Sequence, residues 1–233
     1  MTLVKICGLS TPATLEAALA AGADMVGFVR FARSPRHVEL DRGRELSRQA
    51  EGRAGRVLLM VDPTDAELDD SLAAIAPDLI QLHGGETPAR VVAIRARAGR
   101  PVMKAVAIAD ASDVARIEPY RGAAARILLD AKPPKGAVLP GGNGVAFDWR
   151  LLEGLARPTL CVALGAGGPD LPLMLSGGLA PENVAEAIRI SGLAAVDVSS
   201  GVESAPGVKD ETKIAAFIEA ARAAFAEQNR KVA

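Results

Sequence analysis

The stretch Leu3-Val4-Lys5-Ile6-Cys7-Gly8-Leu9-Ser10-Thr11-Pro12 decides the predicted fold, because it passes directly from a strand pattern to a helix pattern. Val and Ile favour a strand. Thr11 followed by Pro12 is typical of a helix that begins with a capping hydroxyl and a proline in its first turn. Cys7 therefore lies where a strand gives way to a helix, the edge of parallel α/β folds where reacting groups gather. On position alone, a single cysteine is more often a small buried apolar side chain than a catalytic group.

The same strand-then-helix unit recurs along the whole chain. Further strands are predicted at Met25–Val29, Val57–Val61, Leu79–Leu82, Val102–Val106, Arg126–Leu129, Leu173–Leu175 and Ala195–Val198. Helices are predicted at Pro12–Gly22, Asp41–Glu51, after the capping box of Thr64 and Glu67, after Thr87-Pro88, at Ser112–Glu118, from Asp148, from Pro181 and at Lys209–Ala226. Eight such units in 233 residues predict an α/β fold, a single parallel (βα)8 TIM barrel domain spanning residues 1–233, rather than an open doubly wound sheet.

Composition narrows the partners and the compartment. The net charge is −1 with both signs interspersed, so the basic stripe that a nucleic-acid partner requires is missing and a small-molecule partner is expected. A secretory leader and a run of eighteen apolar residues are also missing, which predicts a soluble cytoplasmic protein without a membrane partner. Two cysteines, Cys7 and Cys161, are too few for a disulfide framework, and their spacing suggests no metal site. Cys161 lies in the segment 155–172, which we interpret as an insertion, and is expected to be inert.

Two glycine-containing segments carry the sharpest chemical signal. Ser176-Gly177-Gly178 and Ser199-Ser200-Gly201 follow the seventh and eighth strands, and small residues there let backbone N–H groups approach an anion. Barrels of this type often bind phosphate at this pair of loops. The alternative is that these glycines serve only to make tight turns. The pairing favours a phosphorylated substrate.

Titratable side chains follow or end several other strands. They are Cys7, Arg36, His83, Asp130 and Asp197. Each has a simpler interpretation: a solvated arginine, a turn histidine, an ion pair of Asp130 with Lys132, or a buried hydrogen-bond acceptor. In a parallel barrel, however, all of them would converge on one rim.

The chain resembles the phosphoribosylanthranilate isomerase family of tryptophan biosynthesis over nearly its whole length. The resemblance rests on Lys5-Ile6-Cys7-Gly8, Gly27-Phe28 with Ser34-Pro35-Arg36, Gln81-Leu82-His83-Gly84, Leu129-Asp130-Ala131, Gly141-Gly142-Asn143-Gly144, Phe147-Asp148-Trp149, Leu175-Ser176-Gly177-Gly178-Leu179 and Val196-Asp197-Val198-Ser199-Ser200-Gly201-Val202-Glu203. Two departures are Asn143, where the family more often has Thr, and the long stretch from Arg157 to Pro172.

The resemblance implies a cofactor-free Amadori rearrangement of N-(5-phosphoribosyl)anthranilate to 1-(2-carboxyphenylamino)-1-deoxyribulose 5-phosphate. By matching positions, Asp130 is the general acid and Cys7 the general base, so the thiol should be partly ionised near neutrality. Arg36 is expected to contact the anthranilate carboxylate with two prongs, and Asp197 and His83 to orient the amine and sugar hydroxyls. Gly177, Gly178, Ser200 and Gly201 are expected to hold the phosphate.

Several points stay open. The protein could be a monomer or a homodimer, and Gly136–Gly144 is the best candidate for a lid. The related histidine-pathway sugar isomerase uses a carboxylate where this chain has Cys7, and it needs a second anion site that the sequence does not offer. A metal-dependent epimerase would need more histidines than two. A non-catalytic phosphosugar-binding barrel is the alternative from a different class.

Overall fold

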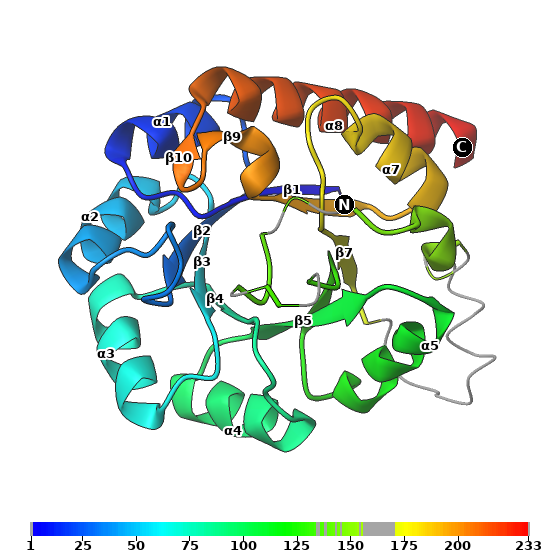
Figure 1. Cartoon of the computed structure of the whole chain (residues 1–233). Coiled ribbons are helices and arrows are strands. Elements are labelled where there is room, and N and C mark those ends of the chain that lie inside the picture. Colours follow the sequence, from blue (N-terminus) through cyan, green and yellow to red (C-terminus); the bar gives the residue numbers. More distant parts are fainter. Residues whose placement is uncertain are drawn as a thin grey trace.

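The protein is a closed barrel of eight parallel strands, ordered in space as in the sequence and surrounded by helices (Figure 1). The computed structural model describes residues 2–133, 136–137, 139–142, 144, 146–153, 155 and 171–232. For residues 231 and 232 it describes the backbone alone. The strands are β1 (Leu3–Cys7), β2 (Met25–Arg30), β3 (Gly55–Met60), β4 (Leu79–Leu82), β5 (Val102–Ile108), β6 (Arg126–Ala131), β7 (Leu173–Leu175) and β8 (Ala195–Val198). The predicted TIM barrel is therefore confirmed. Asn143, Cys161 and most of the predicted insertion at 155–172 lie outside the described residues.

The α-helices pack around the barrel with short 3-10 segments between them. They are α1 (Pro12–Ala20), α2 (Leu40–Ala50), α3 (Asp65–Ile75), α4 (Pro88–Ala98), α5 (Ala111–Val114), α7 (Val184–Ser191) and α8 (Glu211–Val232). The 3-10 helices are η1 (Ala115–Tyr120), η2 (Trp149–Leu152) and η3 (Ser200–Val202). A two-stranded antiparallel hairpin, β9 (Glu203–Ala205) with β10 (Val208–Lys209), follows η3.

Alternation along each strand divides the core into two parts. Val4 and Ile6 of β1 belong to the large cluster between barrel and helices, which also contains the fully buried Phe217 of α8. Leu3 packs instead inside the barrel with a smaller cluster that includes Met103. Side chains of one strand point alternately inward and outward, so every second residue of β1 faces the barrel interior. Lys5 and Cys7 are therefore directed inward, above an apolar floor.

The helix starts that local capping signals predict are confirmed in most cases. Thr11, Thr64 and Thr87 each cap a helix through the side-chain oxygen, and Thr64 with Glu67 forms the complete capping box. Two predicted starts are wrong. Pro181 lies in a turn and α7 begins at Val184, because the side chain of Asn183 bonds the backbone of Gly178 and Ala180 and holds that turn.

The second wrong start is that of the last helix. The prediction placed it at Lys209, but Lys209 pairs across the hairpin in β10 and α8 begins at Glu211. The predicted helix at Ser112–Glu118 is divided between α5 and the 3-10 helix η1, which contains Pro119. Proline lacks the N–H that a continuing α-helix needs.

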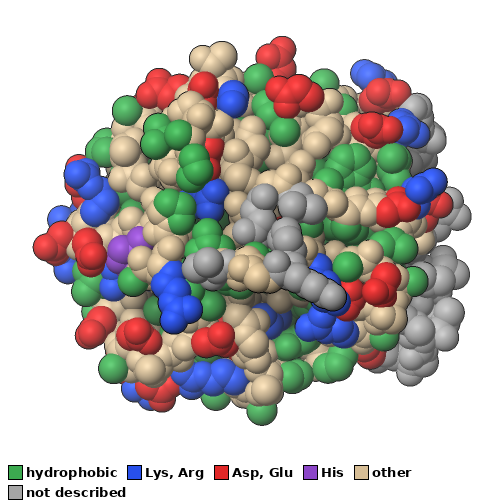
Figure 2. All heavy atoms as spheres, viewed as in Figure 1, with side chains coloured by type: hydrophobic (Ala, Val, Ile, Leu, Met, Phe, Trp, Pro, Cys, Tyr) green, Lys and Arg blue, Asp and Glu red, His purple; other side chains and the backbone are tan. Residues whose placement is uncertain are grey.

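The surface carries charges of both signs. On the face in Figure 2, acidic and basic side chains alternate around the rim without a large patch of one sign. Among the described residues, no helix is both long and apolar enough to cross a membrane.

The Thr64 capping box gives a direct test of the helix signals. Thr64→Ala removes the acceptor for the Glu67 N–H and should lower the free energy of unfolding by about 1 kcal/mol in urea denaturation. Asp70→Ala, on the exposed side of the same helix, should change it by less than about 0.5 kcal/mol. Equal effects of the two substitutions would contradict a capping role.

Candidate active site

A single basin at the carboxyl ends of the strands gathers most of the predicted site residues. It is open to solvent and spans about 790 Å³, the solvent at its mouth included. Its lining includes Cys7, Arg36, His83, Asp130, Gly177, Gly178, Asp197 and Ser200. Described residues 139–142, which follow β6, also line it and cross the middle of the barrel opening in Figure 1.

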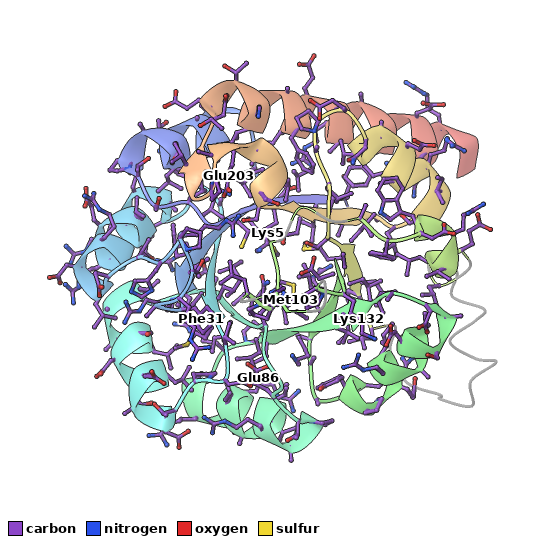
Figure 3. The ribbon with its side chains drawn as sticks, viewed as in Figure 1. Lys5, Phe31, Glu86, Met103, Lys132 and Glu203 are labelled. Atoms are coloured by element: carbon purple, nitrogen blue, oxygen red, sulfur yellow. The ribbon has the colours of Figure 1, made fainter. Side chains whose placement is uncertain are left out.

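The floor of the basin holds a buried ion pair. Lys5 and Asp197 are direct partners in the register of β1 and β8, and Lys5 Nζ donates to Asp197 Oδ1 at 2.8 Å. Lys5 has no exposed surface and points into the barrel (Figure 3). Burial disfavours the ammonium, but Asp197 and then Cys7 outweigh it and raise the pKa of Lys5. The ammonium therefore stays charged beneath Cys7.

Cys7 is the next inward-facing residue after Lys5 on β1 and is 3% exposed. Burial raises the pKa of the Cys7 thiol, while the charges of Lys5 and Lys209 oppose the rise. Burial thus favours the neutral thiol, which runs against the expectation that Cys7 is partly ionised near neutrality. A thiolate of raised pKa is rarer but a stronger base.

Asp130 faces His83 rather than Lys132. His83 Nε2 lies 3.1 Å from Asp130 Oδ2, and the amide nitrogen of the buried Gln81 lies 3.1 Å from His83 Nδ1. Lys132 instead approaches Asp113 at 3.6 Å, so the simple Asp130–Lys132 ion pair does not form. Asp130 is 5% exposed, and it thus combines a hydrogen-bond partner with shielding from water.

Arg36 is held by a carboxylate of the hairpin. Its Nε and Nη2 donate to Glu203 Oε1 and Oε2 at 2.7 and 2.9 Å, and Lys209 Nζ donates to Glu203 Oε1 at 2.8 Å. Burial alone would raise the pKa of Glu203, but Arg36 and Lys209 together hold it below its usual range. Two cations thus share one carboxylate at this side of the basin.

The two glycine-containing loops lie side by side at the rim, and the second leads directly into the hairpin that carries Glu203. Gly177 and Gly178 have φ values of +83° and +65°, which glycine adopts without strain. Within the described part of the chain, the N–H groups of Gly177, Gly178 and Ser200 donate to no other protein group. Gly201 does not line the basin; instead it packs directly against the Leu179 backbone, and a side chain there would collide with that backbone. Gly201 therefore joins the two loops.

Sequence reasoning missed five charged residues in and around the basin. Lys5 could have been predicted, because it lies two positions before Cys7 on the same strand and therefore faces the same side. The roles of Glu203 and Lys209 could not be predicted, since Glu203 contacts Arg36 from 167 positions away and Lys209 joins them through Glu203. Lys104 and Glu86 form a further buried pair at 2.9 Å, behind the loop that carries His83.

No group of three or more His, Cys, Asp or Glu able to hold a metal ion occurs among the described residues.

A family model agrees with this arrangement. The model described as N-(5'phosphoribosyl)anthranilate (PRA) isomerase matches residues 4–220. The chain belongs to this family. Membership of the phosphoribosylanthranilate isomerase family places it among the isomerases of tryptophan biosynthesis, which confirms the enzyme class that the motifs indicated.

Curated relatives and solved structures support the same family. The N-(5'-phosphoribosyl)anthranilate isomerase of Rhodopseudomonas palustris (strain HaA2) is 58% identical over 221 residues, 95% of this chain and 96% of the relative. The crystal structure of the Thermotoga maritima enzyme is 34% identical with a TM-score of 0.80, covering 96% of this chain and all of that one. A phosphoribosylanthranilate isomerase solved in complex with reduced 1-(o-carboxyphenylamino)-1-deoxyribulose 5-phosphate is 32% identical with a TM-score of 0.78, at the same coverage. Another structure, at 33% identity and a TM-score of 0.77 with the same coverage, comes from the Thermotoga maritima enzyme, which is described as dimeric.

The burial of Cys7 predicts a slow thiol. In a Cys161→Ser background, iodoacetamide should alkylate Cys7 more slowly at pH 7 than it alkylates glutathione, because a raised pKa leaves less thiolate. The rate should rise as the pH is increased beyond the ordinary range of thiols. The same chain unfolded in urea serves as the control and should react like free cysteine; equal rates for folded and unfolded chains would contradict the prediction.

Proposed function

We propose that the chain converts N-(5-phosphoribosyl)anthranilate to 1-(2-carboxyphenylamino)-1-deoxyribulose 5-phosphate without a cofactor. The observation that carries the proposal is that Cys7, Asp130, Arg36 and the N–H groups after β7 and β8 line one basin. The reduced product analogue bound by a family member belongs to this reaction. Acid, base and anion sites within one basin are what an aldose-to-ketose rearrangement of a phosphosugar requires.

In the proposed first step, the carboxyl group of Asp130 gives its proton to the furanose ring oxygen. The C1–O bond breaks, the nitrogen lone pair forms the Schiff base, and Asp130 is left as a carboxylate. His83 Nε2, at 3.1 Å from Asp130 Oδ2, stabilises that carboxylate when it donates its N–H. His83 thus lowers the cost of the negative charge that Asp130 gains when it gives up its proton.

In the second step, Cys7 takes the proton from C2 of the Schiff base. The electrons of the C2–H bond form a C1=C2 double bond while those of the C=N bond return to nitrogen, which gives an enol amine. The ketone forms when C1 takes up a proton and the C2 hydroxyl gives one up. Lys5 and Lys209 oppose the cost of ionising the buried thiol. Because burial raises its pKa, the thiolate is a strong base once it forms.

The remaining groups hold the ends of the substrate in this proposal. The N–H groups of Gly177, Gly178 and Ser200, which meet no acceptor among the described residues, bind the phosphate, and the close contact of Gly201 with the Leu179 backbone keeps the two loops together. Arg36 binds the anthranilate carboxylate. His83 and Asp197 contact the sugar hydroxyls and the amine. Asp197 Oδ1 accepts from Lys5 and Oδ2 accepts from the Ser176 hydroxyl at a long 3.4 Å, so Oδ2 keeps the greater capacity for the ligand. Fixing both ends places C2 beside the thiol.

Removing either proposed proton-transfer group should abolish turnover. Cys7→Ala and Asp130→Asn should each lower kcat by about 10³-fold or more with KM changed less than about threefold, because substrate contacts elsewhere remain. The loss of anthranilate-type substrate fluorescence measures the reaction.

Cys161→Ala, which removes the other cysteine, is the matched control and should keep the wild-type kcat. A loss below tenfold in either Cys7→Ala or Asp130→Asn contradicts the roles assigned here. Binding of the substrate by the wild-type protein without any turnover would support the phosphosugar-binding alternative instead.

A further inference from the structure

The guanidinium of Arg36 has one edge paired with Glu203 and lines the basin. Its side chain is 7% exposed, and Glu203 occupies the edge formed by Nε and Nη2. Nη2 also reaches the Gly142 carbonyl, at a long 3.4 Å. Among the described residues, no group accepts a hydrogen bond from Nη1, which lies against Gly142 on the basin wall. Nη1 and the second N–H of Nη2 are therefore the donors that Arg36 offers to an acceptor in the basin.

Glu203 is in turn saturated by its donors. Oε1 accepts from Arg36 Nε and Lys209 Nζ, while Oε2 accepts from Arg36 Nη2 and, at 3.1 Å, from the Gly207 N–H. Its backbone carbonyl also accepts from Lys213 Nζ at 2.8 Å. Figure 3 places Glu203 on the hairpin side of the barrel mouth, away from the barrel centre. The carboxylate therefore has no capacity left for a ligand and acts only on its neighbours.

The charges of this cluster do not cancel. Arg36 and Lys209 carry two positive charges against the single negative charge of Glu203, whereas Lys5 and Asp197 balance each other. Burial lowers the pKa of Lys209, and Glu203 is the main group that opposes this. Glu203 thus keeps two buried cations close together and leaves the cluster one positive charge in excess, which suits a singly charged anion.

We propose that Glu203 is a positioning residue for substrate selection: it holds Arg36 so that the Nη1–Nη2 edge faces the basin and discriminates in favour of an aromatic amine bearing an ortho carboxylate. This inference rests on the proposed function and assigns a role to the Glu203–Lys209 hairpin pair. The two-pronged carboxylate contact is then confined to one edge of Arg36, because the other edge is occupied.

The test compares two ligands that differ only in the carboxylate. The probes are the reduced form of 1-(2-carboxyphenylamino)-1-deoxyribulose 5-phosphate and the same compound with hydrogen in place of the carboxyl group, with binding measured by titration calorimetry. In the wild-type protein the carboxylate should tighten binding about tenfold or more. In Glu203→Gln this advantage should fall to about twofold or less, because the amide NH2 opposes the donors of Arg36 and Lys209.

Asp78→Asn is the matched control. Asp78 accepts from Arg56 Nε and Nη2, each at 2.9 Å, and so makes the same paired contact away from the basin. The Asp78→Asn variant should keep the wild-type ratio of the two dissociation constants. Should Glu203→Gln fail to fold by circular dichroism, Glu203→Asp replaces it; the shorter side chain cannot reach both nitrogens, and the ratio should fall at least about threefold.

The outcomes separate this inference from the proposed function. A wild-type ratio retained in the folded Glu203 variant, or a wild-type protein that binds both probes equally, overturns the role of Glu203. A loss of affinity for both probes by the same factor also overturns it, since that result indicates a general structural role. A wild-type protein that binds neither probe and turns over no substrate contradicts the proposed function itself.

Discussion

The ion pair between Lys5 and Asp197 is the interaction on which the rest of the site depends. It joins the first and last strands, 192 positions apart, at the point where the barrel closes. Both charges are removed from water, so losing one partner would leave the other uncompensated, at a cost of about 3–5 kcal/mol. Its two charges act on Cys7 in opposite senses, since Lys5 lowers the pKa of the thiol and Asp197 raises it. One contact therefore secures the closure of the barrel and the electrostatic environment of the thiol.

Buried charge pairs recur at the rim, each one behind a segment that faces the basin. Glu203 holds Arg36, and the Lys104–Glu86 pair holds the segment that carries His83. Such pairs add little net stability, because desolvation opposes their attraction. Their contribution is to orientation: each pair fixes the position of groups next to those that point into the basin. The burial that stabilises the fold comes mainly from the large apolar cluster between barrel and helices, together with the smaller layer around Met103.

The order of strands and most helix starts could be predicted from the sequence because their signals are local, as at Thr64 with Glu67. The start of α7 could not, since hydrogen bonds of Asn183 within the preceding turn override the signal of Pro181. Residues at strand ends could be assigned to one rim because parallel topology brings those ends together. The partner of Arg36 and the raised pKa of Cys7 depend on distant contacts and on burial, which no local pattern encodes.

Gly84, which follows His83, is held by hydrogen bonds at both its N–H and its carbonyl group. The N–H of Gly84 donates to the Glu86 carboxylate at 3.0 Å, and its carbonyl accepts from Lys104 Nζ at 2.7 Å. The Glu86 carboxylate also accepts from the N–H of Asp62, in the loop after β3. Three successive βα units are thereby tied together, so transplanting the loop after β4 into another barrel would require its neighbours to be carried with it.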